Sequence, residues 1–410
     1  MWLQLSAALA QEAAAPVVPE AVGAQLDVYS DEGITAWAPS ARARLKVGAS
    51  TTVGALWSAD FVSGATPVVA TDAVSAATPF EETRHGGTLD LTHAATRTWT
   101  LNGAATGSTE SDHQVLLGSG GATANLFDDH TRLSAGASLG WVKDGTRADP
   151  GLAGESVDSA VDLGWTQVLG RLSSATLRLT AGYANCDERF GCSASAYRYV
   201  PQGGVFLPER HPAERARLAS SVSLAQSLGH DFALHGNYRF YADSWQVVGH
   251  TGGLALARGL LSGRALTRVE GRAVQQSAAA FWRDGYGSPT DYRTADRELS
   301  GFTEYSGSLR LRWNLFGALR TERVALDAHL SRLWFFYPDY AALSERNAWV
   351  AGGGSMFAGS LFALFACTAG GDTGDSAEAS VPFACDLGVP TGDGWAPLGA
   401  TLELELGFQG

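Results

Sequence analysis

Apolar residues recur at every second position along most of the chain, which is the spacing of a β-strand rather than of a helix. Leu309, Leu311 and Trp313 fall on one face of such a segment, and Arg310 and Arg312 fall on the other. The same alternation runs through three further segments, 53–60, 177–183 and 402–408. The pattern predicts an all-β protein whose strands have one apolar and one polar face.

The lengths and connections of these segments predict a membrane barrel. They run for about ten to fifteen residues, longer than an ordinary strand and close to what a tilted strand needs to cross a bilayer. Tight turns, expected at 48–50, 126–129, 170–171, 229–230, 261–263 and 318–322, alternate with long polar loops, expected at 61–86, 143–154, 187–213, 278–300, 337–346 and 368–395. We expect a transmembrane antiparallel β-barrel of the outer-membrane type, with about 16 strands (range about 14–18) between Val22 and Phe408, short periplasmic turns and long extracellular loops.

Aromatic residues near the ends of several segments support this interpretation. They include the run 334–337, Phe281, Trp282, Trp141 and Trp245, at positions where the interfacial girdles of a barrel would lie. The final segment, TLELELGF, resembles the terminal strand that the outer-membrane assembly machinery reads, although two residues follow its Phe.

The charge of the chain limits its partners. The 410 residues carry a formal net charge of −13, which argues against a general nucleic-acid binder, because phosphate binding needs a basic surface. No stretch approaches about eighteen uninterrupted apolar residues, so a transmembrane helix is not expected.

The N-terminus predicts a targeting segment. Ala8, Leu9 and Ala10 have the form of a signal-peptidase site, although no basic segment precedes them and the apolar run before them is short. We expect residues 1–20 to be the remnant of a signal peptide, truncated by a misplaced start codon, together with a disordered segment; an unstructured soluble tail is the alternative. Residues 21–410 would then form a single outer-membrane barrel domain.

The four cysteines fall into two local pairs within polar loops, Cys186 with Cys192 and Cys367 with Cys385. Neither pair has the spacing of a zinc or thioredoxin motif. The sequence predicts two disulfides and an oxidising compartment, with free buried thiols as the alternative.

The polar faces of the strands would line a lumen too wide for side chains alone to fill. Two interpretations stay open. Either the arginine-rich wall, densest over 264–312, attracts anionic solutes into a pore, or the charges pair across neighbouring strands in a wet interior. The lining residues expected are Arg42, Arg44, Lys46, Arg178, Arg264, Arg268, Arg272, Arg310, Arg312, Glu403 and Glu405.

The loop expected at 61–86 contains two related units, SGATP from Ser63 and SAATP from Ser75. Each Pro fixes its own φ and biases the Thr before it toward extended backbone, while each Ser can bond to nearby amides. We expect neither unit to lie inside a strand, and we expect a stiff loop that constricts or caps the lumen through Ser63, Thr66, Pro67, Ser75, Thr78 and Pro79. His85 is the one candidate base beside it, and no third group completes a catalytic set.

Three motifs of known catalytic classes, HExxH, the P-loop and CxxCH, are absent from the sequence. GASLG at 136–140 has the spacing of a GxSxG motif, but we expect no nucleophile elbow there, because the segment alternates as a strand does. The densest polar cluster, Glu110, Asp112 and His113, is interpreted as the apex of an outward turn. No enzymatic activity, cofactor or metal is expected, and an outer-membrane hydrolase is the weaker alternative.

Four motifs carry a resemblance to a family: VYSD at 28–31, ADFVSGATP at 59–67, AVSAATPF at 73–80 with Arg84, and STESD at 108–112. In these the chain resembles the uncharacterised bacterial outer-membrane β-barrel family catalogued as domain of unknown function 3570. The resemblance implies a barrel in a Gram-negative envelope and supplies no substrate. Members are often encoded beside a small lipoprotein, a thioredoxin-like protein and a flavin transferase, which implies a link to envelope redox maturation; no flavin- or haem-attachment motif of this chain supports that link.

Two functions are therefore expected. The first is a pore or transporter for small solutes, with anions favoured and no substrate defined; the second is a non-conducting scaffold or sleeve for an envelope redox or lipoprotein partner. A channel for hydrophobic compounds is a further alternative, but it predicts an N-terminal plug that the short Ala/Pro-rich segment does not resemble. The first two place the protein in the bacterial outer membrane, in contact with its lipid, lipopolysaccharide and assembly machinery.

Overall fold

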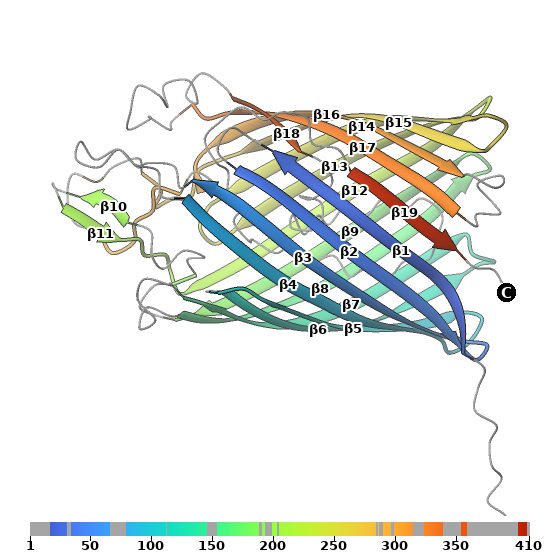
Figure 1. Ribbon diagram of the computed structural model, residues 1–410, viewed down its shortest axis with the longest axis horizontal. Coiled ribbons are helices and arrows are strands. Elements are labelled where there is room, and N and C mark those ends of the chain that lie inside the picture. The colour runs from blue at the N-terminus through green and yellow to red at the C-terminus, as the bar shows by residue number, and fades with distance from the viewer. Residues whose placement is uncertain are drawn as a thin grey trace, which may run out of the picture.

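The chain folds into one antiparallel sheet that curves into a barrel, described here from a computed structural model (Figure 1). The structure describes residues 17–30, 34–65, 79–111, 113–145, 154–187, 191–192, 199–202, 205–283, 286, 290–296, 299–314, 324–338, 354–358 and 401–407. None of these residues forms a helix that is long and apolar enough to cross a membrane.

The strands are long, as the alternating pattern predicts. Their bounds are β1 Val17–Ser30, β2 Ile34–Val47, β3 Thr51–Ala65, β4 Pro79–Ala94, β5 Trp99–Thr109, β6 His113–Leu126, β7 Thr131–Asp144, β8 Gly154–Gly170, β9 Ser173–Cys186, β10 Tyr199–Gln202, β11 Val205–Pro208, β12 Glu214–Gly229, β13 Phe232–Asp243, β14 Val248–Leu260, β15 Ala265–Gln276, β16 Phe302–Asn314, β17 Val324–Phe336, β18 Gly354–Ala358 and β19 Thr401–Gly407.

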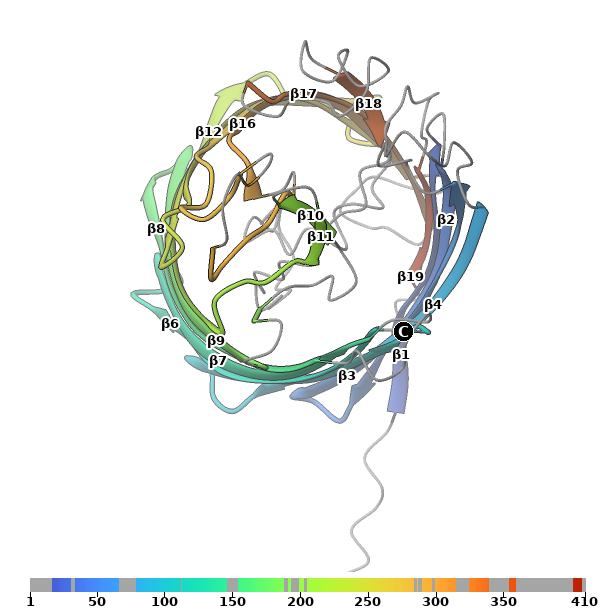
Figure 2. The ribbon, with the colours of Figure 1, turned by 90° about the vertical axis from the view of Figure 1, so that its left-hand side faces the viewer.

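Hydrogen-bonded pairing runs round a full circuit. Strands pair antiparallel in chain order from β1 to β9, then β9 pairs with β12, and the order continues to β17. β19 joins β17 to β1, and Figure 2 views the resulting ring end-on. β18 and β19 pair with successive parts of β17, at 331–335 and 324–329, and so share one position in the wall. The expected antiparallel outer-membrane-type barrel is confirmed, and the described strands occupy sixteen positions in its wall.

The described connections at one end of the barrel are short, and the long connections lie at the other end together with short ones such as 244–247 (Figure 1). Five of the expected tight turns are found, at 48–50, 127–130, 171–172, 230–231 and 261–264, and a further short connection spans 95–98. The turn expected at 318–322 lies outside the described residues. The long connections leave from the opposite end, and the one between β9 and β12 contains the β10–β11 hairpin, which the sequence did not predict.

The connection between β3 and β4 is shorter than expected. β3 continues to Ala65 and β4 begins at Pro79, so the ladder includes Ser63, paired with Glu81, and Pro79, paired with Ala65. The prediction that these two residues belong to a loop is wrong. The small Ser, Gly and Ala residues before Thr66 can pair in a β-ladder. Pro79 is the first residue of its strand, where no amide hydrogen is needed for pairing. Thr66, Pro67, Ser75 and Thr78 lie outside the described residues. β1 likewise begins at Val17, before the expected start near Val22.

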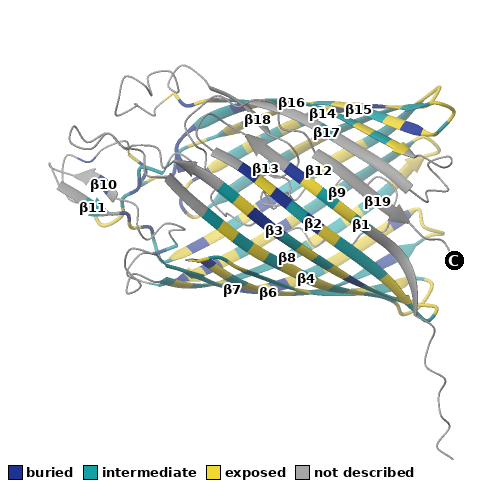
Figure 3. Cartoon of the chain, viewed as in Figure 1, coloured by how far each residue is buried: buried dark blue, intermediate teal, exposed yellow. Residues whose placement is uncertain are grey.

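The two faces of the wall differ sharply in character. Residues with alternating exposure form stripes along the strands (Figure 3), and the exposed stripes carry large apolar side chains such as Leu89, Leu116 and Leu139, each more than 60 % exposed. Since a soluble protein would bury such a surface, this outer face lies against lipid. Exposed aromatics lie toward both ends of the strands, with Trp99, Trp165 and Trp313 nearer the turns and Trp37, Tyr183 and Tyr305 nearer the loops.

Candidate pore and cap

The strand register places most of the charged side chains of the described wall on the inner face, and a few, such as Arg258 and Glu155, lie on the outer face. Arg310 and Arg312 alternate with the exposed Leu309, Leu311 and Trp313, as the sequence pattern predicts. The same alternation assigns Arg42, Arg44 and Lys46 of β2, Arg178 of β9, and Arg268 and Arg272 of β15 to the lumen. Glu403 and Glu405 of β19 fall in register with Asp327 and Ala325 of β17. Arg264 lies in the 261–264 turn rather than in a strand, so it does not belong to the inward-facing row of arginines on β15.

Several lumenal cations form ion pairs with carboxylates. Arg217 of β12 reaches Asp158 of β8 at 2.6 Å, passing over the intervening strand β9. Gly182 lies beneath this side chain, and a Cβ at that position would be 3.6 Å from Arg217 Nε. Arg268 pairs with Glu270 on its own strand at 3.0 Å. For these residues the geometry favours the second sequence interpretation, pairing within the wall.

At the loop end of the barrel, three neighbouring connections pack together into what we term the cap: the described residues of 187–213, 244–247 and 277–301. Its apolar core consists of Trp245, Val247, Ala279, Trp282 and Leu299, all buried. Phe281 packs edge-on against Trp245, with ring centroids 5.3 Å apart. In Figure 2 the β10–β11 hairpin of the first connection lies within the outline of the ring, and in Figure 1 it extends past the strand ends, so this connection overlies the mouth.

Asp243 shapes the cap from the end of β13. Its Oδ1 accepts hydrogen bonds from the amides of Trp245 and Val247, both at 2.9 Å, which fixes the turn that carries the core tryptophan. Its Oδ2 accepts from Nε and Nη2 of Arg215 at 2.9 and 2.6 Å, and the guanidinium also lies 4.1 Å over the Trp245 ring. The buried pair thus joins the wall to the cap.

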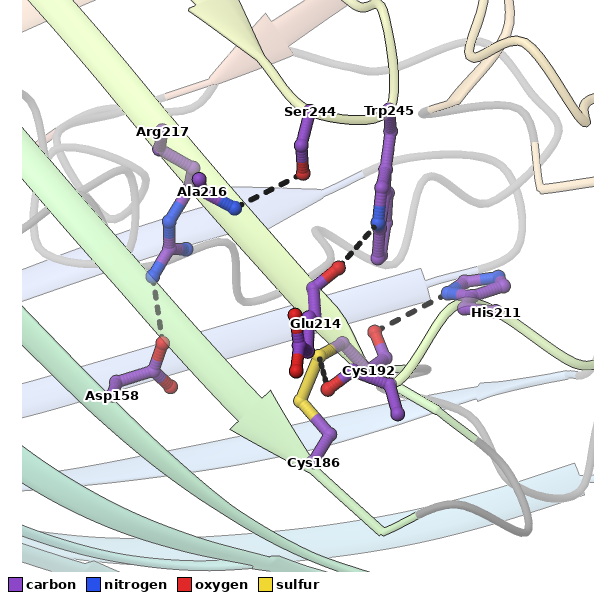
Figure 4. Close-up of a disulfide and its surroundings, with 10 residues drawn as sticks. Asp158, Cys186, Cys192, His211, Glu214, Ala216, Arg217, Ser244 and Trp245 are labelled. Carbon is purple, nitrogen blue, oxygen red and sulfur yellow. Dashed lines mark hydrogen bonds and ion pairs between the residues drawn. A yellow bond between two sulfur atoms is a disulfide. The ribbon is translucent and has the colours of Figure 1, made fainter.

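A disulfide between Cys186 and Cys192 fastens the first connection to the end of β9, as the sequence predicted. Figure 4 shows it beside β12, with His211 and Trp245 nearby. His211 Nδ1 lies 3.2 Å from the Cys192 carbonyl oxygen, and its ring contacts Trp245 and Phe281 at centroid distances of 5.2 and 5.4 Å. The predicted pair Cys367 and Cys385 lies outside the described residues.

The third connection is fastened to the first by buried polar groups. Glu209, 1 % exposed, accepts a hydrogen bond from the Thr294 hydroxyl, and Arg210 and Arg293 exchange backbone hydrogen bonds at 3.0 and 2.9 Å. The Tyr286 hydroxyl lies 2.6 Å from the Phe281 carbonyl oxygen and accepts from the Thr294 amide at 2.7 Å. Burial raises the pKa of Tyr286, against opposing effects of the Thr294 backbone and Arg283.

The cap corrects one part of the sequence interpretation. Trp245 and Trp282 are only 3 % and 6 % exposed and belong to the cap core, not to an interfacial girdle. Their positions near strand ends do not distinguish a lipid-facing ring from one buried under a loop, because that depends on which connections meet in space. The length and cysteine content of 187–213 are the signals in the sequence that a structured appendage occurs there.

The polar cluster near His113 is also part of the barrel rim. His113 begins β6, and its Nδ1 lies 2.5 Å from Asp144 Oδ1 on β7, while Glu110 lies in the connection before it; Asp112 lies outside the described residues. Within the part of the chain that the structure describes, no three His, Cys, Asp or Glu side chains gather where they could hold a metal ion.

A family comparison agrees with this architecture. The model of the family described as "Protein of unknown function (DUF3570)" matches residues 3–151 and 143–327, which is more than half of the chain. The chain belongs to this family. The resemblance predicted from its N-terminal motifs is confirmed, and the description of the DUF3570 family assigns no activity. No curated protein matches the chain.

Three solved barrels illustrate what the chain is similar to. A mutant of the ferric enterobactin receptor of Pseudomonas aeruginosa is 11 % identical over 77 % of this chain and 53 % of its own, with a TM-score of 0.44. The chain thus spans about half the length of that receptor. The outer membrane protein opdK of Pseudomonas aeruginosa is 8 % identical over 96 % and 99 %, with a TM-score of 0.43, and OccD1 (OprD) is 6 % identical over 97 % and 98 %, with a TM-score of 0.46. Sequence identities and TM-scores this low do not indicate which solute, if any, the chain binds or transports.

Proposed function

We propose that this protein is an outer-membrane pore or transporter for small solutes. The observation that carries the proposal is the circuit of sixteen positions formed by the described strands, with a polar, charged inner face. Barrels of about sixteen strands leave an aqueous channel, because side chains cannot fill their interior. The cap over one mouth supports a channel narrowed for small molecules rather than an open pore. The role proposed is not enzymatic.

The anion preference predicted from the arginine ladders is proposed to be weak. Arg217 and Arg268 each face a carboxylate partner, so part of the cationic charge is compensated within the wall. A planar bilayer under a KCl gradient measures this through the reversal potential. A value close to the ideal chloride potential would contradict a weak preference.

Solute uptake by proteoliposomes tests the pore directly. Purified protein, with its fold verified by heat-modifiable migration in electrophoresis, should admit small sugars at rates that fall with solute size. A correctly folded barrel that admits none of them, and shows no single-channel conductance, would overturn the proposal.

The cap over the mouth also favours the second candidate, a non-conducting scaffold for an envelope lipoprotein or redox partner. Its buried core and disulfide would offer a stable surface outside the membrane. Mild crosslinking in cells, followed by purification, tests this candidate. Recovery of the barrel without a lipoprotein, together with conductance in bilayers, would exclude it.

Pro67, in the β3–β4 connection, and Pro79, the first residue of β4, remain a proposed constriction element. Replacing Pro67 and Pro79 by Gly should raise conductance if this connection narrows the lumen, because the chain gains backbone freedom. Unchanged conductance would mean that the segment between β3 and β4 joins the two strands without narrowing the lumen.

A further inference from the structure

Four inward-facing glycines share one arrangement with the strands on either side of them. We term them the inner glycines: Gly54 of β3, Gly164 of β8, Gly182 of β9 and Gly253 of β14. On one side each pairs in register with an arginine, and these partners are, in the same order, Arg44, Arg178, Arg217 and Arg272. Counted from the turn end, the inner glycines are the fourth, seventh, tenth and eighth residues of their strands, so they lie across the middle of the wall.

A polar side chain from the strand on the other side covers three of the inner glycines. The register pairs are Gly54 with Asp90 of β4, Gly164 with Ser134 of β7, and Gly253 with Asn237 of β13. A Cβ at Gly54 would overlap the Asp90 carboxylate, and a Cβ at Gly253 would be 2.8 Å from Asn237 Oδ1. The Ser134 hydroxyl likewise fills the position of a Cβ at Gly164. The three polar groups therefore occupy the space that the glycines leave free.

Arg217 is the longest side chain of this kind. It passes over Gly182 and ends on Asp158 of β8, with 2.6 Å between Nη2 and Oδ1 (Figure 4). Side chains on a sheet ordinarily stand perpendicular to it, which in a barrel is toward the axis. The four side chains that cover the inner glycines instead extend toward a neighbouring strand, about 4.8 Å away, and so lie along the wall. Glycine allows this, because it lets another group approach a strand closely.

We infer that the inner glycines set the charge and the width of the lumen, by letting polar side chains of neighbouring strands lie along the wall instead of standing in the channel. The inference rests on the proposed pore and names residues that determine its selectivity. A side chain that lies along the wall takes up less of the cross-section of a pore, and its charge is farther from the path of a solute.

Gly54→Ala tests the charge of the lumen without changing the formal charge of the protein. Its methyl group takes the place of the Asp90 carboxylate, which is the end of a flexible side chain and moves away from the wall. A carboxylate in the lumen attracts cations. Under a KCl gradient we expect the reversal potential to shift toward cation preference, with the ratio of potassium to chloride permeability rising about two-fold.

Gly118→Ala is the matched control for this shift. Gly118 pairs in register with the exposed Leu139 on the outer face of β6 and β7, and a Cβ there meets nothing within 4 Å. The permeability ratio should therefore equal that of the parent. Gly54→Ala combined with Asp90→Asn should not show the rise, because the displaced group then carries no charge.

Gly253→Ala tests the width of the lumen, since the group that it displaces is the uncharged Asn237 amide. Single-channel conductance should fall by roughly a tenth, because the narrowed wall adds resistance in series with the cap. Adding Asn237→Ala should restore the conductance of the parent, whereas Asn237→Ala alone should leave it unchanged. Gly252→Ala is the control, because Gly252 lies on the outer face of the same strand with nothing within 4 Å of its Cβ position.

The outcomes separate the inference from the proposed function. Each variant is first checked for folding by heat-modifiable migration. A permeability ratio in Gly54→Ala equal to that of the parent, or an equal rise in Gly118→Ala, overturns the inference and leaves the pore intact. The same holds if Gly253→Ala keeps the conductance of the parent, and this comparison decides if Gly54→Ala does not fold. No conductance by the folded parent barrel overturns the pore and the inference together.

Discussion

Gly191 shows how one residue holds the cap in place. Its φ is +68°, and a Cβ at this position would clash with the His211 carbonyl oxygen. Its amide donates to the Asp187 carbonyl oxygen at 2.8 Å, within the loop that the Cys186–Cys192 disulfide closes. The absence of a side chain lets the backbone of 211–212 approach this loop, and the approach brings His211 against Trp245.

Gly191→Ala should therefore loosen the cap without unfolding the barrel. The left-handed conformation alone costs an alanine about 1–2 kcal/mol, and the clash adds to that cost. We expect faster cleavage of the 187–213 connection by trypsin, with heat-modifiable migration of the barrel unchanged. Gly170→Ala is the control, since a Cβ there meets nothing within 4 Å; equal cleavage rates in both variants would contradict the role of Gly191.

Tyr286 makes the cap sensitive to alkaline pH. Burial raises the pKa of its hydroxyl, so the folded cap favours the neutral form. The resulting stabilisation is present below the unfolded pKa of about 10 and is lost as pH rises through the folded pKa. We expect trypsin sensitivity of the parent protein, measured with a short protease pulse at each pH, to rise above about pH 10. Tyr286→Phe should be more sensitive to trypsin at neutral pH, because the Thr294 amide loses its acceptor. It should also lack the rise in sensitivity that depends on ionisation of Tyr286. Identical plots of trypsin sensitivity against pH for the two proteins would refute the assignment.

At the scale of elements, the strands could be predicted from sequence and the cap could not. Alternation such as Leu309 to Trp313 reports which face a residue takes, because a strand has a local period of two. The sequence pattern does not predict the ladder at Ser63, because the small residues from Ser63 to Ala65 do not alternate between apolar and polar side chains. The core of Trp245, Phe281 and His211 joins three connections far apart in sequence, and no local pattern encodes that meeting. The ion pair between Arg217 and Asp158 likewise depends on β9 presenting Gly182 between them.

The cap core offers a test of whether the cap narrows the mouth. Trp245→Ala removes the central buried ring, and such truncations cost about 3–5 kcal/mol. We expect higher single-channel conductance and faster trypsin cleavage within 277–301, while the barrel stays folded. Phe127→Ala, at a turn where the side chain is 76 % exposed, is the control. Unchanged conductance in a Trp245→Ala protein with a proteolysed cap would mean that the cap does not limit flow.

For the whole molecule, the barrel and the cap are held by different forces. The wall depends on a continuous ladder and on lipid, whereas the cap depends on a small core, the ion pair between Arg215 and Asp243 and the Cys186–Cys192 disulfide. A disulfide closing so short a loop contributes about 2 kcal/mol. The two parts should therefore fail separately, the cap first.

Replacing both Cys186 and Cys192 by Ser should release the first connection while leaving the barrel assembled in the membrane. We expect cleavage of 187–213 by protease added to whole cells, and heat-modifiable migration as in the parent. Loss of the barrel itself from the outer membrane in this variant would show that the disulfide is needed for assembly rather than for the cap alone.

The cap covers one mouth, and the described connections at the other mouth are short turns. A charged channel that is narrowed at one end does not pass current equally in both directions. Current through single oriented channels should accordingly rectify, with the preferred direction set by which side of the bilayer receives the cap. The rectification should weaken in Trp245→Ala, because loosening the cap makes the two mouths of the channel more alike. The ratio of the currents at opposite voltages thus measures the difference between the two ends of the barrel.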